Sequence, residues 1–229
     1  MIEDSPILTM KKKIIRPSQS QLNAFKKFQT GHIVDALSGR GALSGDIKAI
    51  SKKYSNFVGS ALTCLCGPAD NLAAIAAIGV AEEGDVIVAA TDKFKGTAVM
   101  GDLMLGIAKN RGVKAFVTDG YVRDIEGINK HFFPCFASGT IPNSPARNGP
   151  GTIGMSIVCG EVNISSGDII VGDIDGIVVV PHKIINDIID KLEEVIKLEK
   201  EAEKKVNKGA KSTELIDKIF KNGSIKIID

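Results

Sequence analysis

The chain is poor in the residues that mark nucleic-acid and membrane proteins. It has no tryptophan, only two tyrosines among 229 residues, and a net charge of +2. Aromatic platforms for single-stranded nucleic acid are therefore scarce, and no excess of positive charge is available to follow phosphates. No apolar run reaches the roughly 18 residues that a membrane span requires, and the N-terminal stretch lacks the order of a secretory signal. We expect a cytoplasmic protein with no nucleic-acid partner and no membrane segment.

Cysteine and histidine are also sparse, and their spacing does not favour a redox or zinc site. The cysteines fall in apolar or strand-like runs without a CxxC pair, at Cys64, Cys66, Cys135 and Cys159. Small buried thiols in a reducing compartment explain this pattern better than disulfides. The three histidines form no His-x-x-x-His pair, so neither a histidine zinc site nor a catalytic triad is supported.

What the chain does have is the composition of a globular protein with a sizeable core. Hydrophobic residues make up 44%, charged residues 24%, and there are 24 glycines. The length suits one α/β domain. Residues 1–17 read as an irregular N-terminal arm, and residues 18–229 as a single domain that includes the C-terminal helices.

Alternating helical and strand patterns predict the α/β class. The expected helices cover 19–28, 32–37, 71–79, 101–109, 124–129, 182–206 and a last short segment capped by Thr213. The expected strands cover 56–64, 86–90, 113–118, 135–138, 152–158, 169–171 and 177–180. Hairpin turns are expected at 166–168 and 173–176.

The most informative stretch for chemistry contains Asp102, Arg123 and Asp124. Twenty residues separate Asp102 from Arg123, enough for one helix, a turn and one strand before the chain returns. Both carboxylates can then lie at one edge of a sheet, where helix N-termini favour an anionic substrate. Two acids beside an arginine, without nearby histidine or cysteine, suit Mg²⁺ or Mn²⁺ and not zinc. The residues leave open a plainer alternative, in which Asp102 caps a helix and Arg123 pairs with Asp124 on the surface.

Over roughly residues 30 to 205 the sequence resembles the RraA-like family. That family includes the 4-hydroxy-4-methyl-2-oxoglutarate aldolases, which are class II pyruvate aldolases, and the regulators of ribonuclease E activity. The signature is Gly101-Asp102 followed after twenty residues by Arg123-Asp124. Further matching blocks are Asp35-Ala36-Leu37, Gly67-Pro68-Ala69, Gly84-Asp85-Val86, Pro134 to Gly139, Ser166-Gly167-Asp168 and Asp173 to Pro181.

The resemblance implies a three-layer β/β/α swivelling-domain fold with a long C-terminal helix, assembled as trimers or hexamers. It implies that Asp124 binds the divalent metal and that Asp102 holds a metal-bound water. Arg123 would contact the 2-oxo acid, whose carboxylate would meet backbone N–H groups of Gly101, Asp102, Leu103 and Met104. In some members a glutamate of a neighbouring subunit completes the site. Glu199 is the candidate here, although a solvated face is the stronger explanation because Glu193, Glu194, Glu201 and Glu203 share that helix.

The activity implied is a metal-dependent lyase that releases pyruvate from 4-hydroxy-4-methyl-2-oxoglutarate-type 2-oxo acids and also decarboxylates oxaloacetate. Arg123 and Asp102 would be the catalytic residues. Two alternatives remain. One is a non-catalytic regulator that binds a ribonuclease or another protein partner, and the other is a related hydroxy-acid or sugar-acid conversion in the same cleft.

Overall fold

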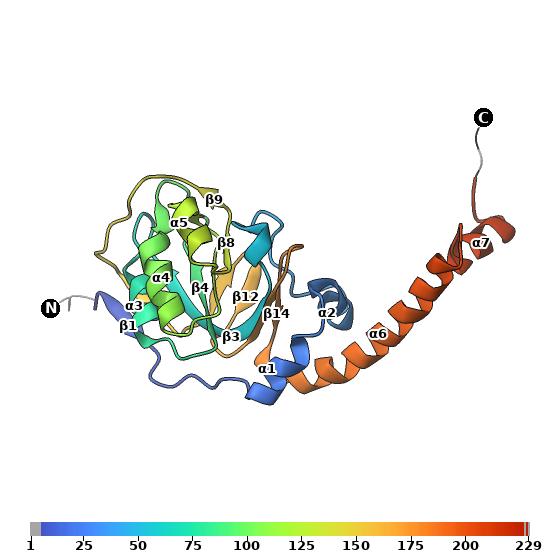
Figure 1. The fold of residues 1–229 in the computed structure, drawn as a ribbon, viewed down its shortest axis with the longest axis horizontal. Helices are drawn as coiled ribbons and strands as arrows, with labels where there is room; N and C mark the ends of the chain where they lie inside the picture. Colours follow the sequence, from blue (N-terminus) through green and yellow to red (C-terminus); the bar gives the residue numbers. More distant parts are fainter. Residues whose placement is uncertain (1–5, 227, 229) are drawn as a thin grey trace.

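The computed structural model describes residues 6–226 and residue 228 (Figure 1). A nine-stranded sheet crosses its centre in the order β1-β10-β3-β4-β6-β8-β2, with β13 also paired to β3 and β14 paired to β13. Four neighbouring strands run parallel and form the middle of the sheet: β3 (Phe57–Cys66), β4 (Asp85–Ala90), β6 (Ala115–Thr118) and β8 (Cys135–Ala137). Their near-continuous apolar sequences are typical of strands buried on both faces.

The remaining strands of this sheet extend it on both sides. The long strand β3 pairs through Cys64–Cys66 with β10 and through Phe57–Ser60 with β13, both antiparallel. These outer strands are β1 (Leu8–Met10), β2 (Lys48–Ala49), β10 (Gly151–Ile153), β13 (Ile169–Gly172) and β14 (Ile177–Val180). The turn at 173–176 joins the antiparallel pair β13 and β14, which confirms the expected hairpin.

Two smaller sheets accompany the large one. Strands β5 (Ala98–Met100), β7 (Tyr121–Val122) and β9 (Gly139–Thr140) form a parallel sheet of very short strands. Each follows one of the central strands along the chain, after β4, β6 and β8 respectively. Strands β11 (Ile157–Cys159) and β12 (Val162–Ile164) form an antiparallel hairpin.

The layers follow from which face each element covers. Helices α3 (Leu72–Val80), α4 (Asp102–Asn110) and α5 (Ile125–Lys130) pack on one face of the large sheet. The hairpin β11–β12 covers the other face through Ile157, Cys159 and Ile164. The result is the α/β fold with helix, sheet and sheet layers that the family resemblance predicted.

A third cluster of apolar side chains attaches the long C-terminal helix. Helices α1 (Gln19–Phe25), α2 (Thr30–Ala36) and α6 (Ile185–Asn207) pack together against β13 and β14. Ile185, Ile188 and Leu192 of α6 are buried, so one face of the helix packs on the body of the protein, whereas Leu198 farther along is 60% exposed. Beyond them α6 and α7 (Glu214–Lys221) project away from the sheet (Figure 1).

Short 3₁₀ turns occupy Lys52–Tyr54 and His182–Ile184. Within the described part of the chain, no helix is both long and apolar enough to cross a bilayer.

Three local predictions were wrong. The single strand expected at 152–158 is two strands, β10 and β11, which belong to different sheets. The arm at residues 1–17 is not wholly irregular, because Leu8–Met10 pair in parallel with Gly151–Ile153 and Arg16 forms two hydrogen bonds with buried Asp85. Residues 1–5 of that arm lie outside the described residues. The turn at 166–168 does not close a hairpin, because β12 and β13, which it joins, belong to different sheets. Gly and Asp mark a change of direction there without revealing which strands pair.

Candidate functional site

The pairing of two very short strands brings Asp102 close to Arg123 and Asp124. Gly101 and Asp102 directly follow β5, and Arg123 and Asp124 directly follow β7. These strands are parallel neighbours, so their carboxyl ends meet at one edge, and the N–H of Arg123 donates to the carbonyl of Met100 at 3.0 Å. The predicted residues therefore meet at the carboxyl ends of two strands of the small sheet. They do not lie at the carboxyl end of β6, which ends at Thr118 in the large sheet.

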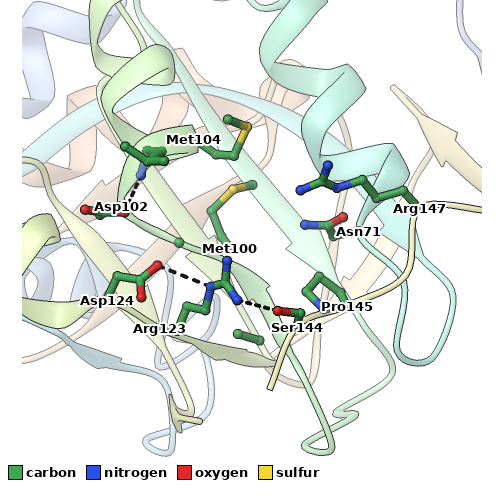
Figure 2. Close-up of a pocket in the computed structure, with 12 residues that line it drawn as sticks. Asn71, Met100, Asp102, Met104, Arg123, Asp124, Ser144, Pro145 and Arg147 are labelled. Atoms are coloured by element: carbon green, nitrogen blue, oxygen red, sulfur yellow. Dashed lines mark hydrogen bonds and ion pairs between the residues drawn. The ribbon is translucent and has the colours of Figure 1, made fainter. Parts of the chain in front are cut away.

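A pocket of about 120 Å³ opens at this edge. Every residue predicted from the sequence to bind substrate or metal, apart from Glu199, lines it: Gly101, Asp102, Leu103, Met104, Arg123 and Asp124. Figure 2 shows the two carboxylates at one end, Arg123 in the middle, and Asn71 and Arg147 at the other end. The pocket thus has an acidic end suited to a cation and a basic end suited to an anion.

The backbone conformation of Asp124 is unusual, and its side chain lines the pocket. Asp124 precedes α5 with a left-handed backbone at φ 63°, and its side chain forms no capping hydrogen bond. Such a conformation is uncommon for a residue other than glycine and recurs at functional sites. Gly101 allows the approach, because a Cβ there would stand 2.5 Å from Oδ2 of Asp124.

The structure bears on both parts of the plainer alternative for these acids. Gly101 is the N-cap of α4, and Asp102 is its first helical residue, so the prediction of Asp102 as a plain cap is wrong. Its Oδ1 accepts a hydrogen bond from the N–H of Leu103 at 2.7 Å. A substrate carboxylate would have to compete with this bond for the Leu103 N–H. Arg123 and Asp124 do form an ion pair, with Nε 3.2 Å from Oδ2, but both side chains line the pocket.

Three further polar residues of the pocket escaped the sequence analysis. Asn71 is 4% exposed, its Nδ2 donates to the carbonyl of Val99 at 2.9 Å, and its Oδ1 has no partner among the described residues. Ser144 accepts a hydrogen bond from Nη1 of Arg123 at 2.6 Å, and Arg147 lines the far end. Ser144 and Arg147 lie in a loop with no periodic pattern, so no local signal could have found them.

A second, wider cavity lies beside the same acids. Its volume is about 510 Å³, and Asp102 and Asp124 line it together with Glu126, Lys130 and His131. The two carboxylates therefore stand between two cavities. A cation held by them would be reachable from both sides.

Glu199 does not line this pocket in its own chain. It lies on α6, where its carboxylate contacts Nε2 of His32. The Nδ1 of His32 accepts the N–H of Gln29 at 3.1 Å, so Nε2 carries the hydrogen and donates to Glu199. A role for Glu199 at the pocket requires a second copy of the chain and stays a prediction.

A family model described as RraA-like (Aldolase/RraA) matches residues 30–179, which contain all of the pocket residues. The chain belongs to this family. A relative from Halalkalibacterium halodurans, named "Putative 4-hydroxy-4-methyl-2-oxoglutarate aldolase", is 39% identical over 160 residues, 70% of this chain and 76% of that protein. The similarity to a named aldolase supports a lyase-type enzyme.

Solved structures of other proteins agree with the architecture. An uncharacterized protein from Pseudomonas syringae superposes with a TM-score of 0.75 at 26% identity, over 86% of this chain and 96% of that one. The RNA-processing inhibitor RraA from Thermus thermophilis superposes with a TM-score of 0.62 at 22% identity, over 68% and 93%. At that identity the second likeness concerns the fold alone.

Proposed function

We propose that this protein is a metal-dependent class II pyruvate aldolase. It cleaves 2-oxo acids of the 4-hydroxy-4-methyl-2-oxoglutarate type to pyruvate and also decarboxylates oxaloacetate. The observation that carries the proposal is one pocket in which Asp102, Arg123 and Asp124 converge. The name of the 39% identical relative supports the same substrate class.

The side chains at the acidic end fit Mg²⁺ or Mn²⁺. Asp124 would bind the ion directly and Asp102 would hold one of its waters, because hard cations take oxygen ligands and keep several waters. Among the described residues, no group of three or more His, Cys, Asp or Glu side chains forms a closed metal cage. Zinc prefers three or four such ligands, so the pair of carboxylates disfavours it. When bound, the ion would act as a Lewis acid on the keto oxygen of the substrate.

Side chains and backbone of the protein itself would bind the substrate, stabilise the developing charge and accept the proton. Arg123 binds the 2-oxo acid and stabilises the negative charge that develops on its keto oxygen as the C3–C4 bond breaks. Asp102, through a water, accepts the proton that leaves the C4 hydroxyl, so that C4 becomes a carbonyl carbon. The electrons of the C3–C4 bond remain on the C1–C3 half as an enolate, and return of the proton to C3 gives pyruvate. The N-terminus of α4 faces the substrate carboxylate with a favourable dipole. No lysine Schiff base is needed.

We further propose that the active form is a homotrimer or hexamer in which Glu199 serves the site of a neighbouring subunit. The support is indirect. Glu199 lies on α6 beyond Leu192, the last fully buried residue of that helix, and the pocket of the same chain lacks it.

The experiment that tests the function is pyruvate release from 4-hydroxy-4-methyl-2-oxoglutarate and from oxaloacetate, with Mg²⁺, with Mn²⁺ and with excess EDTA. We expect metal-dependent release in the wild type and no release in Asp124→Ala, whose carboxylate is about 40% exposed and supports no core packing. A folded wild type without turnover on either substrate would refute the proposal. That result would favour a binding role like that of the RNA-processing inhibitor whose fold it shares.

A further inference from the structure

Arg123 and its neighbour Asp124 make an unusually incomplete ion pair. Arginine and carboxylate groups commonly meet as a fork, with two parallel hydrogen bonds. Arg16 and Asp85 of this protein do so, at 2.8 and 2.9 Å. Arg123 instead pairs with Asp124 through Nε, 3.2 Å from Oδ2, while its Nη1 hydrogen-bonds another residue. The guanidinium therefore does not meet this carboxylate as a fork.

Ser144 is the residue that Nη1 of Arg123 contacts. Nη1 of Arg123 donates to Oγ of Ser144 at 2.6 Å, and Figure 2 shows Arg123 between Asp124 on one side and Ser144 on the other. Because arginine has no acceptor, the hydroxyl oxygen must accept this bond. The hydroxyl hydrogen of Ser144 then remains free to donate to another oxygen.

The loop that carries Ser144 is fastened on both sides of it. Before Ser144, the carbonyl of Asn143 accepts the N–H of Ala98, the first residue of β5, at 2.9 Å. After it, Ala146 donates to the carbonyl of Ala69 at 2.7 Å and accepts the N–H of Asn71 at 3.1 Å. Ser144 therefore has little freedom to follow Arg123 toward Asp124.

Buried Asp70 reinforces the second attachment. Its Oδ2 accepts the N–H groups of Asn148 at 2.5 Å and Gly149 at 3.1 Å, while its Oδ1 accepts that of Leu72 at 2.8 Å. Asp70 thus ties the loop to the start of α3. The anchor is part of the folded body and not of the pocket.

We propose that Ser144 is a positioning residue that prevents Arg123 from closing on Asp124 as a fork. The carboxylate of Asp124 is then left available to a divalent cation, and Arg123 stays directed toward the basic end of the pocket, where an anion would bind. The role in cation binding rests on the proposed function, whereas the role in holding Arg123 does not.

The direct test is a pair of crystal structures, of the wild type and of Ser144→Ala, both without metal. We expect two guanidinium nitrogens of Arg123 on the carboxylate of Asp124 in the variant and one in the wild type. Ser144→Thr keeps the hydroxyl and should keep the wild-type arrangement. An unchanged Arg123 in Ser144→Ala would overturn the inference.

The second test measures Mn²⁺ binding by electron paramagnetic resonance of the free ion. In Ser144→Ala the closed pair competes with the ion, so affinity should fall about three- to fivefold, the size expected for a half-exposed ion pair. Ser144→Thr should bind as the wild type does. Asn143→Ala is the matched control, because Asn143 lies in the same loop as Ser144 and its side chain donates a hydrogen bond to the carbonyl of Gly96, not to Arg123.

The double variant separates positioning from a general effect on the loop. In an Arg123→Ala background no guanidinium remains to close on Asp124, so Ser144→Ala should no longer change Mn²⁺ affinity. An equal loss in that background, or in Asn143→Ala, would overturn the inference. A wild type that binds no Mn²⁺ would refute the proposed function instead, and the crystal structures would then decide the role of Ser144 alone.

Discussion

Adding one methyl group at Gly101 should disable the site while leaving the fold intact. Gly101 has an extended backbone, φ −129° and ψ 177°, which alanine adopts without strain. A Cβ at this position would stand 2.5 Å from Oδ2 of Asp124 and 3.2 Å from Nε of Arg123. The Gly101→Ala variant therefore places the new atom against the two side chains on which the proposed chemistry depends.

The expected loss follows from that distance. Ordinary contact begins near 3.4 Å, so the carboxylate of Asp124 must retreat by about 0.9 Å. A displacement of about 1 Å in a reacting group lowers rates by roughly a hundredfold, or about 2.7 kcal/mol of transition-state stabilisation. The measurement is kcat/KM for pyruvate release, accompanied by Mn²⁺ affinity. The melting temperature should change by less than about 4 °C, since Asp124 is exposed and can move into solvent.

Gly79→Ala is the matched control for this substitution. Gly79 lies inside α3, and nothing stands within 4 Å of a Cβ built there. Alanine should raise helix stability by about 0.5 to 1 kcal/mol and leave kcat/KM unchanged. Folded Gly101→Ala protein with more than half of the wild-type kcat/KM would show that Asp124 and Arg123 need not occupy their observed positions.

Three further predictions concern stability and thiol reactivity. Arg16→Met should lower the free energy of unfolding in urea by about 3 kcal/mol, because it leaves the fully buried carboxylate of Asp85 without its partner; a change below about 0.5 kcal/mol would contradict this. Burial raises the pKa of the Cys135 and Cys159 thiols, so iodoacetamide near pH 8 should label them only after unfolding. Because their folded pKa lies above the unfolded one, unfolding free energy should also decline above about pH 9. Rapid labelling of the native protein would refute the burial argument.

The elements with strong local patterns could be predicted from the sequence. The apolar run at Phe57–Cys66 forms the central strand, and the spacing of Ile185, Ile188 and Leu192 buries one face of a long helix. Thr213 caps the last helix by accepting the N–H of Ile216, as expected. Such segments can be recognised because burial of one face gives a periodic pattern of apolar residues, and burial of both faces gives a continuous apolar run.

The core of the site was also accessible to sequence reasoning. Asp102, Arg123 and Asp124 stand out as charged residues at element boundaries, and the spacing between them suffices to bring the chain back to one edge. The spacing could not show that the sheet whose edge holds these residues is the small one, formed by β5, β7 and β9. Strands of two or three residues, such as β5 and β7, carry too few side chains to show any period.

Only the tertiary structure decided how the site is completed. Ser144 reaches Arg123 across 21 positions, and Asp70 holds Asn148 across 78, through a loop without regular structure. Likewise Arg16 finds Asp85, and His32 finds Glu199, because packing of separate elements brings them together. Periodicity reports which face of an element is buried, whereas the choice of partner depends on contacts between segments far apart in the chain. The sequence by itself therefore determined the α/β elements and the central acid–arginine set, and the fold alone determined which groups restrain them.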